Sequence, residues 1–156
     1  WVQSVDRERI ARRLSDARPQ GLSPLNVLIQ VNVSGEATKS GAAPRDVAAL
    51  ARATAALPRL KLRGLMAIPE PGGDVAQQRA RFRAVRAIFD GLCADGLALD
   101  TLSMGMSDDL EAAIAEGSTM VRIGTAIFGP REQRAADAAD GNVATPGANG
   151  AQLLSA

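Results

Sequence analysis

The sequence predicts an α/β fold in which about five parallel strands alternate with helices. Short apolar segments suited to strands lie at residues 1–5, 26–33, 62–68, 102–104 and 119–123. Segments with helical spacing of apolar residues separate them, and strict alternation of strand and helix is typical of a parallel sheet with helical cover. Five strands are too few to close an eight-stranded barrel. We therefore expect part of a TIM-type (β/α) barrel whose N-terminal strands are missing from this chain.

Three helices are predicted from the residues at their ends. The first follows Ser4, a suitable N-cap; the second begins at Pro44 and ends before Pro58; the third follows Asp74 and ends before Gly96. Serine and aspartate are favoured at N-caps, proline in the first turn, and glycine just past the last turn. The second helix should bury Val47, Leu50, Thr54 and Leu57, and the third Phe82, Val85, Phe89 and Leu92.

The clearest strand is segment 26–33, where apolar and polar side chains alternate. Valine and isoleucine occupy every second position, and Leu28, Gln30 and Asn32 lie between them. Side chains of a strand alternate between its two faces. A strand with one apolar and one mixed face suits a barrel wall, with Gln30 and Asn32 near the polar mouth.

Residues 101–129 contain the expected binding site. Ser107 is interpreted as the N-cap of a helix that ends at Gly117, and residues 119–123 form the next strand, followed by Gly124 and Thr125. In a TIM-type barrel a phosphate commonly binds after the last two strands, beside a short extra helix, which residues 126–128 can supply. Backbone N–H groups and hydroxyls at two such junctions are suitable ligands for a phosphate.

Composition excludes several kinds of protein. The 156 residues suit one domain, and 18 basic against 17 acidic residues give no electrostatic reason for nucleic-acid binding. No apolar run is long enough to span a membrane, and no signal peptide is visible. The only cysteine, Cys93, excludes an internal disulfide, which suits the cytoplasm. The chain has no histidine and no tyrosine, and it starts at Trp1, which suggests a fragment or a processed chain.

Arg122 is the residue whose position most needs explanation. Its place in the strand puts it on the barrel interior with Met120 and Gly124. An unpaired buried charge is costly, so Arg122 contacts either a ligand or a carboxylate of another strand. The acidic residues Asp108, Asp109 and Glu111 could bind a metal, but carboxylates at a helix start more commonly stabilise the helix dipole.

Several motifs together resemble the YggS/PROSC family of pyridoxal phosphate homeostasis proteins. They are LNVLIQVNVSGEATKSG, LRGLMAIP, LSMGMSDDLEAAIAEGSTMVRIGTAIFG and SVDRERIARRL. The resemblance covers residues 1–131 and implies a single α/β barrel like the N-terminal domain of alanine racemase. It implies a protein that binds pyridoxal 5′-phosphate through a Schiff base, and that buffers and delivers this cofactor without catalysis, with cofactor-dependent apo-enzymes as acceptors. Residues 132–156 are alanine- and glycine-rich and predict a disordered tail.

The resemblance also implies roles for individual residues. Ser107, Gly124 and Thr125 would hold the phosphate, with Met106 and Ile123 beside them, and Arg122 would face the pyridine nitrogen. Lys39 matches a second, loop lysine of the family, whereas the lysine that forms the Schiff base belongs to an upstream segment that this chain lacks. The chain therefore resembles the C-terminal, phosphate-binding part of such a protein.

Two other functions fit the same fold. The first is a racemase or decarboxylase dependent on pyridoxal phosphate, although two-base racemisation typically needs a tyrosine, which is absent here. The second is binding of a different phosphorylated ligand, because a fold alone does not specify the ligand.

Overall fold

The computed structural model of this chain describes residues 1–33, 40–70 and 72–129. Within these residues four parallel strands form one sheet, in the order β1 (Val2–Val5), β2 (Leu25–Val31), β3 (Leu60–Ala67) and β4 (Thr101–Ser103). The helices are α1 (Glu8–Ala17), α2 (Pro44–Ala55), α3 (Val75–Ala94), α4 (Leu110–Ala115) and α5 (Thr125–Phe128). Parallel strands separated by helices confirm the predicted α/β class, and the sheet is an incomplete barrel. Lys39 and the predicted tail lie outside the described residues.

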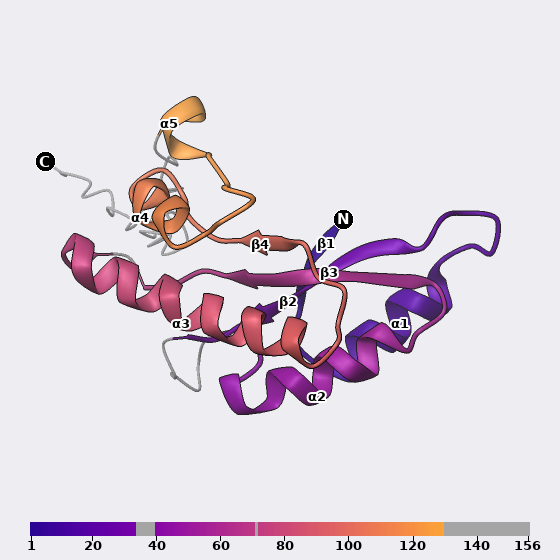
Figure 1. Cartoon of the computed structure of the whole chain (residues 1–156). Coiled ribbons are helices and arrows are strands. Elements are labelled where there is room, and N and C mark those ends of the chain that lie inside the picture. The colour runs from indigo at the N-terminus through magenta and orange to yellow at the C-terminus, as the bar shows by residue number, and fades with distance from the viewer. Residues whose placement is uncertain (34–39, 71, 130–156) are drawn as a thin grey trace, which may run out of the picture.

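Helices α1, α2 and α3 lie along one face of the sheet (Figure 1). The predicted stripe of α3 is buried there, as are Val47, Leu50 and Thr54 of α2. Alternating residues Val27, Ile29 and Val31 of β2 face this core. Leu28, between them, is also fully buried, so both faces of β2 are covered at that point.

The predicted strand at residues 119–123 is wrong in extent. Only Met120 pairs, through an isolated parallel bridge to Ser103. Side chains replace the regular ladder on either side of the bridge: the Thr119 hydroxyl accepts from the Leu102 N–H at 2.8 Å, and the Ser118 hydroxyl donates to the Met104 carbonyl at 2.7 Å. Serine and threonine hydroxyls that form hydrogen bonds with backbone N–H and C=O groups occupy the partners that a β-ladder would need.

Two predicted helix starts have different outcomes. The Asp74 carboxylate accepts from the Gln77 N–H at 2.8 Å and caps α3, which confirms that prediction. Ser4 does not cap α1, because β1 continues to Val5 and the N-cap position is Arg7, whose side chain makes no capping bond. Ser4 belongs to β1, which pairs with β2, so the helix can begin only after the strand ends.

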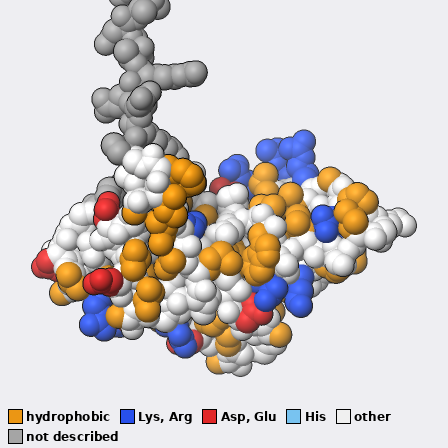
Figure 2. All heavy atoms as spheres, turned by 90° about the horizontal axis from the view of Figure 1, so that it is seen from above, with side chains coloured by type: hydrophobic (Ala, Val, Ile, Leu, Met, Phe, Trp, Pro, Cys, Tyr) orange, Lys and Arg blue, Asp and Glu red, His pale blue; other side chains and the backbone are white. Residues whose placement is uncertain are grey.

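The opposite side of the sheet carries α4 and α5, near the end at which β3 and β4 finish (Figure 1). Seen from above, this side shows hydrophobic side chains at the surface (Figure 2). The most exposed large ones at α5 are Phe128, which is 85% exposed, and Ile127, which is 67% exposed. None of the helices among the described residues combines the length and apolar character needed to cross a membrane.

Candidate functional site

A pocket of about 590 Å³ lies at the carboxyl ends of β3 and β4. Its lining includes all six residues predicted to bind cofactor: Met106, Ser107, Arg122, Ile123, Gly124 and Thr125. Asp108, Phe128 and Gly129 complete the lining and were not among the residues predicted to bind the cofactor. The structure therefore brings two chain segments together at one place, the loop after β4 and the segment from Arg122 to α5.

The loop after β4 is shaped by a glycine and an aspartate. Gly105 has φ +95°, and a Cβ there would lie 2.6 Å from the Ala113 side chain. The Asp109 carboxylate accepts from the Met106 N–H at 2.6 Å. These contacts close a turn before α4 starts at Leu110, so the prediction that Ser107 is the N-cap of this helix is wrong.

Ser107 instead connects the loop to α5. Its hydroxyl oxygen accepts from the Ala126 N–H at 3.3 Å. The backbone N–H groups of Ile123, Gly124 and Thr125 have no acceptor among the described residues. Neighbouring N–H groups of this kind, next to the hydroxyls of Ser107 and Thr125, are well suited to bind the oxygens of an anion.

Arg122 is held by neutral groups. Its Nη1 donates to the Ser103 carbonyl at 2.9 Å and to the Ser103 hydroxyl at 2.6 Å, and its Nη2 donates to the Ala67 carbonyl at 2.9 Å. A guanidinium has five N–H donors. The Nε–H and one Nη2–H of Arg122 therefore have no acceptor among the described residues.

The charge of Arg122 is also not paired. Among the described residues, no carboxylate lies within ion-pair distance of this guanidinium. Burial lowers the pKa of Arg122, and the charge of Asp109 opposes this shift. An arginine remains protonated at neutral pH even so. Of the two expectations for Arg122, the structural ion pair is not observed, and a positive charge with spare donors lines the pocket.

Sequence reasoning missed the residues that hold Arg122. The Ser103 hydroxyl donates to Gln3 Oε1 at 2.7 Å, across 100 positions of the chain. The only sequence features that could have pointed to these residues are a serine in the apolar segment of β4 and a glutamine in β1. Neither signal indicates its partner, because strand pairing decides which residues meet.

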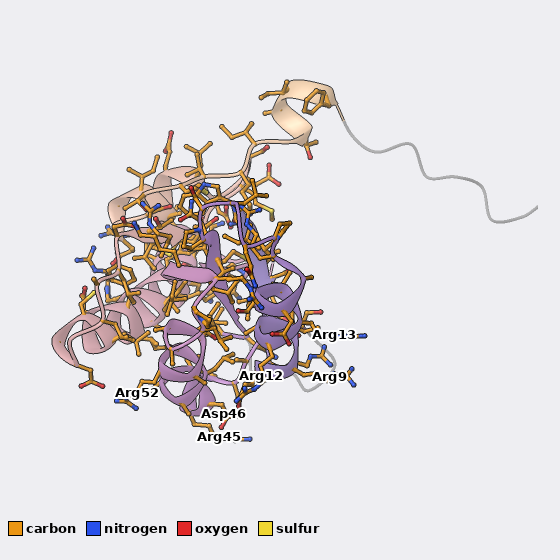
Figure 3. All side chains as sticks on the ribbon, turned by 90° about the vertical axis from the view of Figure 1, so that its right-hand side faces the viewer. Arg9, Arg12, Arg13, Arg45, Asp46 and Arg52 are labelled. Carbon is orange, nitrogen blue, oxygen red and sulfur yellow. The ribbon has the colours of Figure 1, made fainter. Side chains whose placement is uncertain are left out.

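Arginines on α1 and α2 form a separate surface feature. Figure 3 shows Arg9, Arg12, Arg13, Arg45 and Arg52 on the outside of these helices, on the side of the molecule away from α5. Arg12 pairs with Glu8, and Arg52 pairs with Asp95 at 2.6 Å. These side chains do not line the pocket at the ends of β3 and β4.

Curated relatives match most of the chain. It is 64% identical over 132 residues to a pyridoxal phosphate homeostasis protein of Pseudomonas aeruginosa, and 57% identical over 132 residues to one of Escherichia coli. The match covers 85% of this chain, and the chain spans 56% of the length of each relative. The resemblance inferred from the sequence motifs is thereby confirmed.

Solved structures agree in fold. PipY of Synechococcus elongatus without pyridoxal phosphate has a TM-score of 0.74 at 37% identity, over 83% of this chain and 61% of PipY. PipY with pyridoxal phosphate bound has a TM-score of 0.66 at 35% identity, over 83% of this chain and 60% of PipY. Alanine racemase of Corynebacterium glutamicum, at 18% identity and a TM-score of 0.60 over 80% of this chain and 34% of the racemase, shows the shared fold alone.

A family model for the N-terminal domain of alanine racemase matches residues 1–132. The match includes every described strand and helix and both segments of the pocket. By sequence and by fold, this chain belongs to the family of the alanine racemase N-terminal domain.

Proposed function

We propose that this chain binds pyridoxal 5′-phosphate as part of a protein of cofactor homeostasis in the cytoplasm. The observation that carries the proposal is one pocket in which N–H groups without an acceptor among the described residues and two hydroxyls lie beside an arginine that no described carboxylate pairs. Relatives named pyridoxal phosphate homeostasis proteins and PipY with pyridoxal phosphate bound support the choice of ligand. The pocket volume lies in the ordinary range for small-molecule sites.

The residues present fit the chemical groups of this cofactor. Ser107, Thr125 and the N–H groups of Gly124 and Thr125 would hold the phosphate, and Met106 and Ile123 would contact the apolar parts of the ligand. The unused donors of Arg122 would face the ring nitrogen. Bound pyridoxal phosphate can act as an electron sink, and protonation of the ring nitrogen strengthens this property.

The charge of Arg122 supports the non-catalytic role that we propose. A guanidinium beside the ring nitrogen disfavours ring protonation, which weakens the cofactor as an electron sink. Within this chain there is also no tyrosine or histidine to act as a second base. We therefore propose buffering of the cofactor and its delivery to apo-enzymes, in preference to racemase or decarboxylase activity.

The test is substitution of Arg122. We predict that Arg122→Ala weakens pyridoxal phosphate binding about tenfold or more, because hydrogen bonds to charged groups are among the strong ones. The melting temperature should fall as well, because the buried carbonyls of Ser103 and Ala67 lose a donor, but the chain should still fold. Binding is followed by absorbance and by calorimetry with pyridoxine 5′-phosphate, which has no aldehyde.

Arg45→Ala is the matched control, because this exposed arginine of α2 does not line the pocket. It should leave both affinity and melting temperature unchanged. Unchanged affinity in Arg122→Ala, combined with a collapsed melting temperature, would assign Arg122 to the fold and contradict the proposed site.

A further inference from the structure

We infer that Ser103 and Gln3 are positioning residues for Arg122. They fix the position of the guanidinium through hydrogen bonds to uncharged groups. Its positive charge is therefore not neutralised by a carboxylate and can act on the ring nitrogen of the ligand. The inference rests on the proposed function for its ligand, but the positioning itself concerns this chain alone.

The contacts form a directed chain from β1 to the pocket. Gln3 Oε1 accepts from the Ser103 hydroxyl at 2.7 Å, and the same hydroxyl oxygen accepts from Arg122 Nη1 at 2.6 Å. A hydroxyl has one hydrogen to donate. Because that hydrogen goes to Gln3, the oxygen lone pairs of Ser103 are left for Arg122.

The far end of this chain of contacts is also anchored. The Gln3 amide donates from Nε2 to the Met120 sulfur at 3.2 Å, which leaves its carbonyl oxygen directed to Ser103. Met120 precedes Arg122 by two residues and pairs with Ser103 in the isolated bridge. The three side chains therefore brace the backbone that carries Arg122 as well as its guanidinium.

Burial makes these bonds hard to replace. Ser103 is completely buried, so water cannot readily take the place of its hydroxyl. Removing the hydroxyl would leave one Arg122 N–H and the Gln3 carbonyl without this partner. Buried polar groups left without a partner are costly, and the arginine is expected to move in response.

The direction of that movement can be inferred from charge. In the described part of the chain, the charge of Asp109 raises the pKa of Arg122 against the larger effect of burial, which lowers it. A guanidinium that has lost the Ser103 hydroxyl should shift towards this carboxylate, which would partly neutralise its charge. The ring nitrogen of a bound ligand would then protonate more easily.

Neither Ser103 nor Gln3 lines the pocket, so both act through Arg122. This separates them from the residues proposed to touch the ligand. A purely structural role would lower stability without changing the state of Arg122 or of the ligand ring. The two roles therefore differ in measurable ways.

The first experiment needs no ligand. Side-chain NMR of the 156-residue chain labelled with ¹⁵N should show resolved Nη signals for Arg122, because three hydrogen bonds restrain its guanidinium. Ser103→Ala should broaden or average them, and Ser103→Thr, which keeps the hydroxyl, should restore them. Gln3→Met, of similar length without the amide, should give an intermediate result and is the second variant should Ser103→Ala fold poorly.

The second experiment uses pyridoxine 5′-phosphate as the probe. A pH titration of its absorbance when bound should show a ring-nitrogen pKa that rises by about one unit in Ser103→Ala, a tenfold change in the protonation equilibrium. Arg122 signals that stay resolved in both Ser103→Ala and Gln3→Met would overturn the inference. Lack of binding by the unmodified chain would contradict the proposed function, while the ligand-free NMR would still decide the positioning.

Discussion

Gly64 lies where β3 comes closest to the start of β4. Its φ is +153°, and a Cβ at this position would be 1.8 Å from the Thr101 carbonyl oxygen and 3.2 Å from the Phe89 ring. The carbonyl belongs to the backbone of the neighbouring strand and cannot rotate away. Only glycine allows β3 and β4 to pair at this distance, and this pairing places Ala67 and Ser103 beside Arg122.

We predict that Gly64→Ala lowers the free energy of unfolding by at least about 3 kcal/mol, at the upper end of the usual cost of overpacking. Urea unfolding followed by circular dichroism measures it. Gly91→Ala in α3 is the matched control, because no atom lies within 4 Å of its added Cβ. Replacing a helical glycine by alanine should stabilise by roughly 0.5–1 kcal/mol. Equal effects of the two substitutions would contradict the close approach of β3 and β4.

Glu116 connects α4 to α3. Its side chain, 9% exposed, accepts from Arg79 Nε at 2.7 Å and from Arg83 Nη2 at 3.0 Å. The hydrogen bond from Arg83 and then that from Arg79 hold the pKa of Glu116 below its usual value. Since α4 follows the loop that carries Met106 and Ser107, this contact also helps to hold one wall of the pocket.

A lowered folded-state pKa determines how this contact depends on pH. The contribution to stability is fully present above the unfolded pKa of about 4.3 and is lost as the pH falls through the folded value. We predict that Glu116→Gln lowers the melting temperature at pH 7, and that the difference from the unmodified chain shrinks below about pH 4. Glu111→Gln, at an exposed position of α4, should have little effect at either pH. A difference that stays constant in acid would show that Glu116 acts through packing.

The sheet as a whole has open edges. Among the described residues β1 pairs only with β2, and beyond β4 only the bridge at Met120 follows. Unpaired strand edges and exposed apolar side chains promote association. Figure 2 shows hydrophobic side chains at the surface of this side of the molecule. By exposed fraction, Ile127 and Phe128 of α5 are the most exposed large hydrophobic residues of the described chain.

We therefore predict that the 156-residue chain associates at micromolar concentrations. Size-exclusion chromatography with light scattering should show a mass that rises with concentration. Phe128→Gln should reduce association without lowering the melting temperature, because this side chain is 85% exposed. A sharp monomer peak for the unmodified chain would contradict the prediction and would mean that the open edges are covered.

We also predict that this chain does not attach pyridoxal phosphate covalently in stoichiometric amount. Its two lysines are Lys39, outside the described residues, and Lys61. Lys61 lies near the start of β3, six residues before Ala67 at the pocket end, or about 20 Å along an extended strand. Borohydride reduction followed by mass spectrometry should show no full pyridoxyl adduct. A stoichiometric adduct on either lysine would contradict the prediction.

Local patterns were sufficient for most elements. The Asp74 cap and the apolar stripe of α3 depend on residues three or four apart, and such contacts form within a single helix. The place of Gly124 and Thr125 in the pocket was also predictable, because the carboxyl ends of parallel strands meet at one edge of a sheet. Their role as cofactor ligands stays a prediction.

Competition between local and distant partners decided the rest. Ser107 has the sequence context of an N-cap, but the bond from Asp109 to Met106 moves the helix start, and Ser107 binds Ala126 instead. Residues 119–123 have the composition of a strand. However, the Thr119 hydroxyl accepts from the Leu102 N–H, and the Ser118 hydroxyl donates to the Met104 carbonyl, so these backbone groups do not form a regular ladder with the segment.

The sequence by itself determined the α/β class, the family and six of the residues that line the pocket. Only the tertiary structure decided how Arg122 is held, because Gln3 and Ser103 are separated by 100 positions and meet only when β1 and β4 are placed by the sheet. A hydrogen bond depends on distances of about 3 Å and on direction. Composition and periodicity specify which face a residue occupies, whereas such distances are set by the packing of the whole molecule.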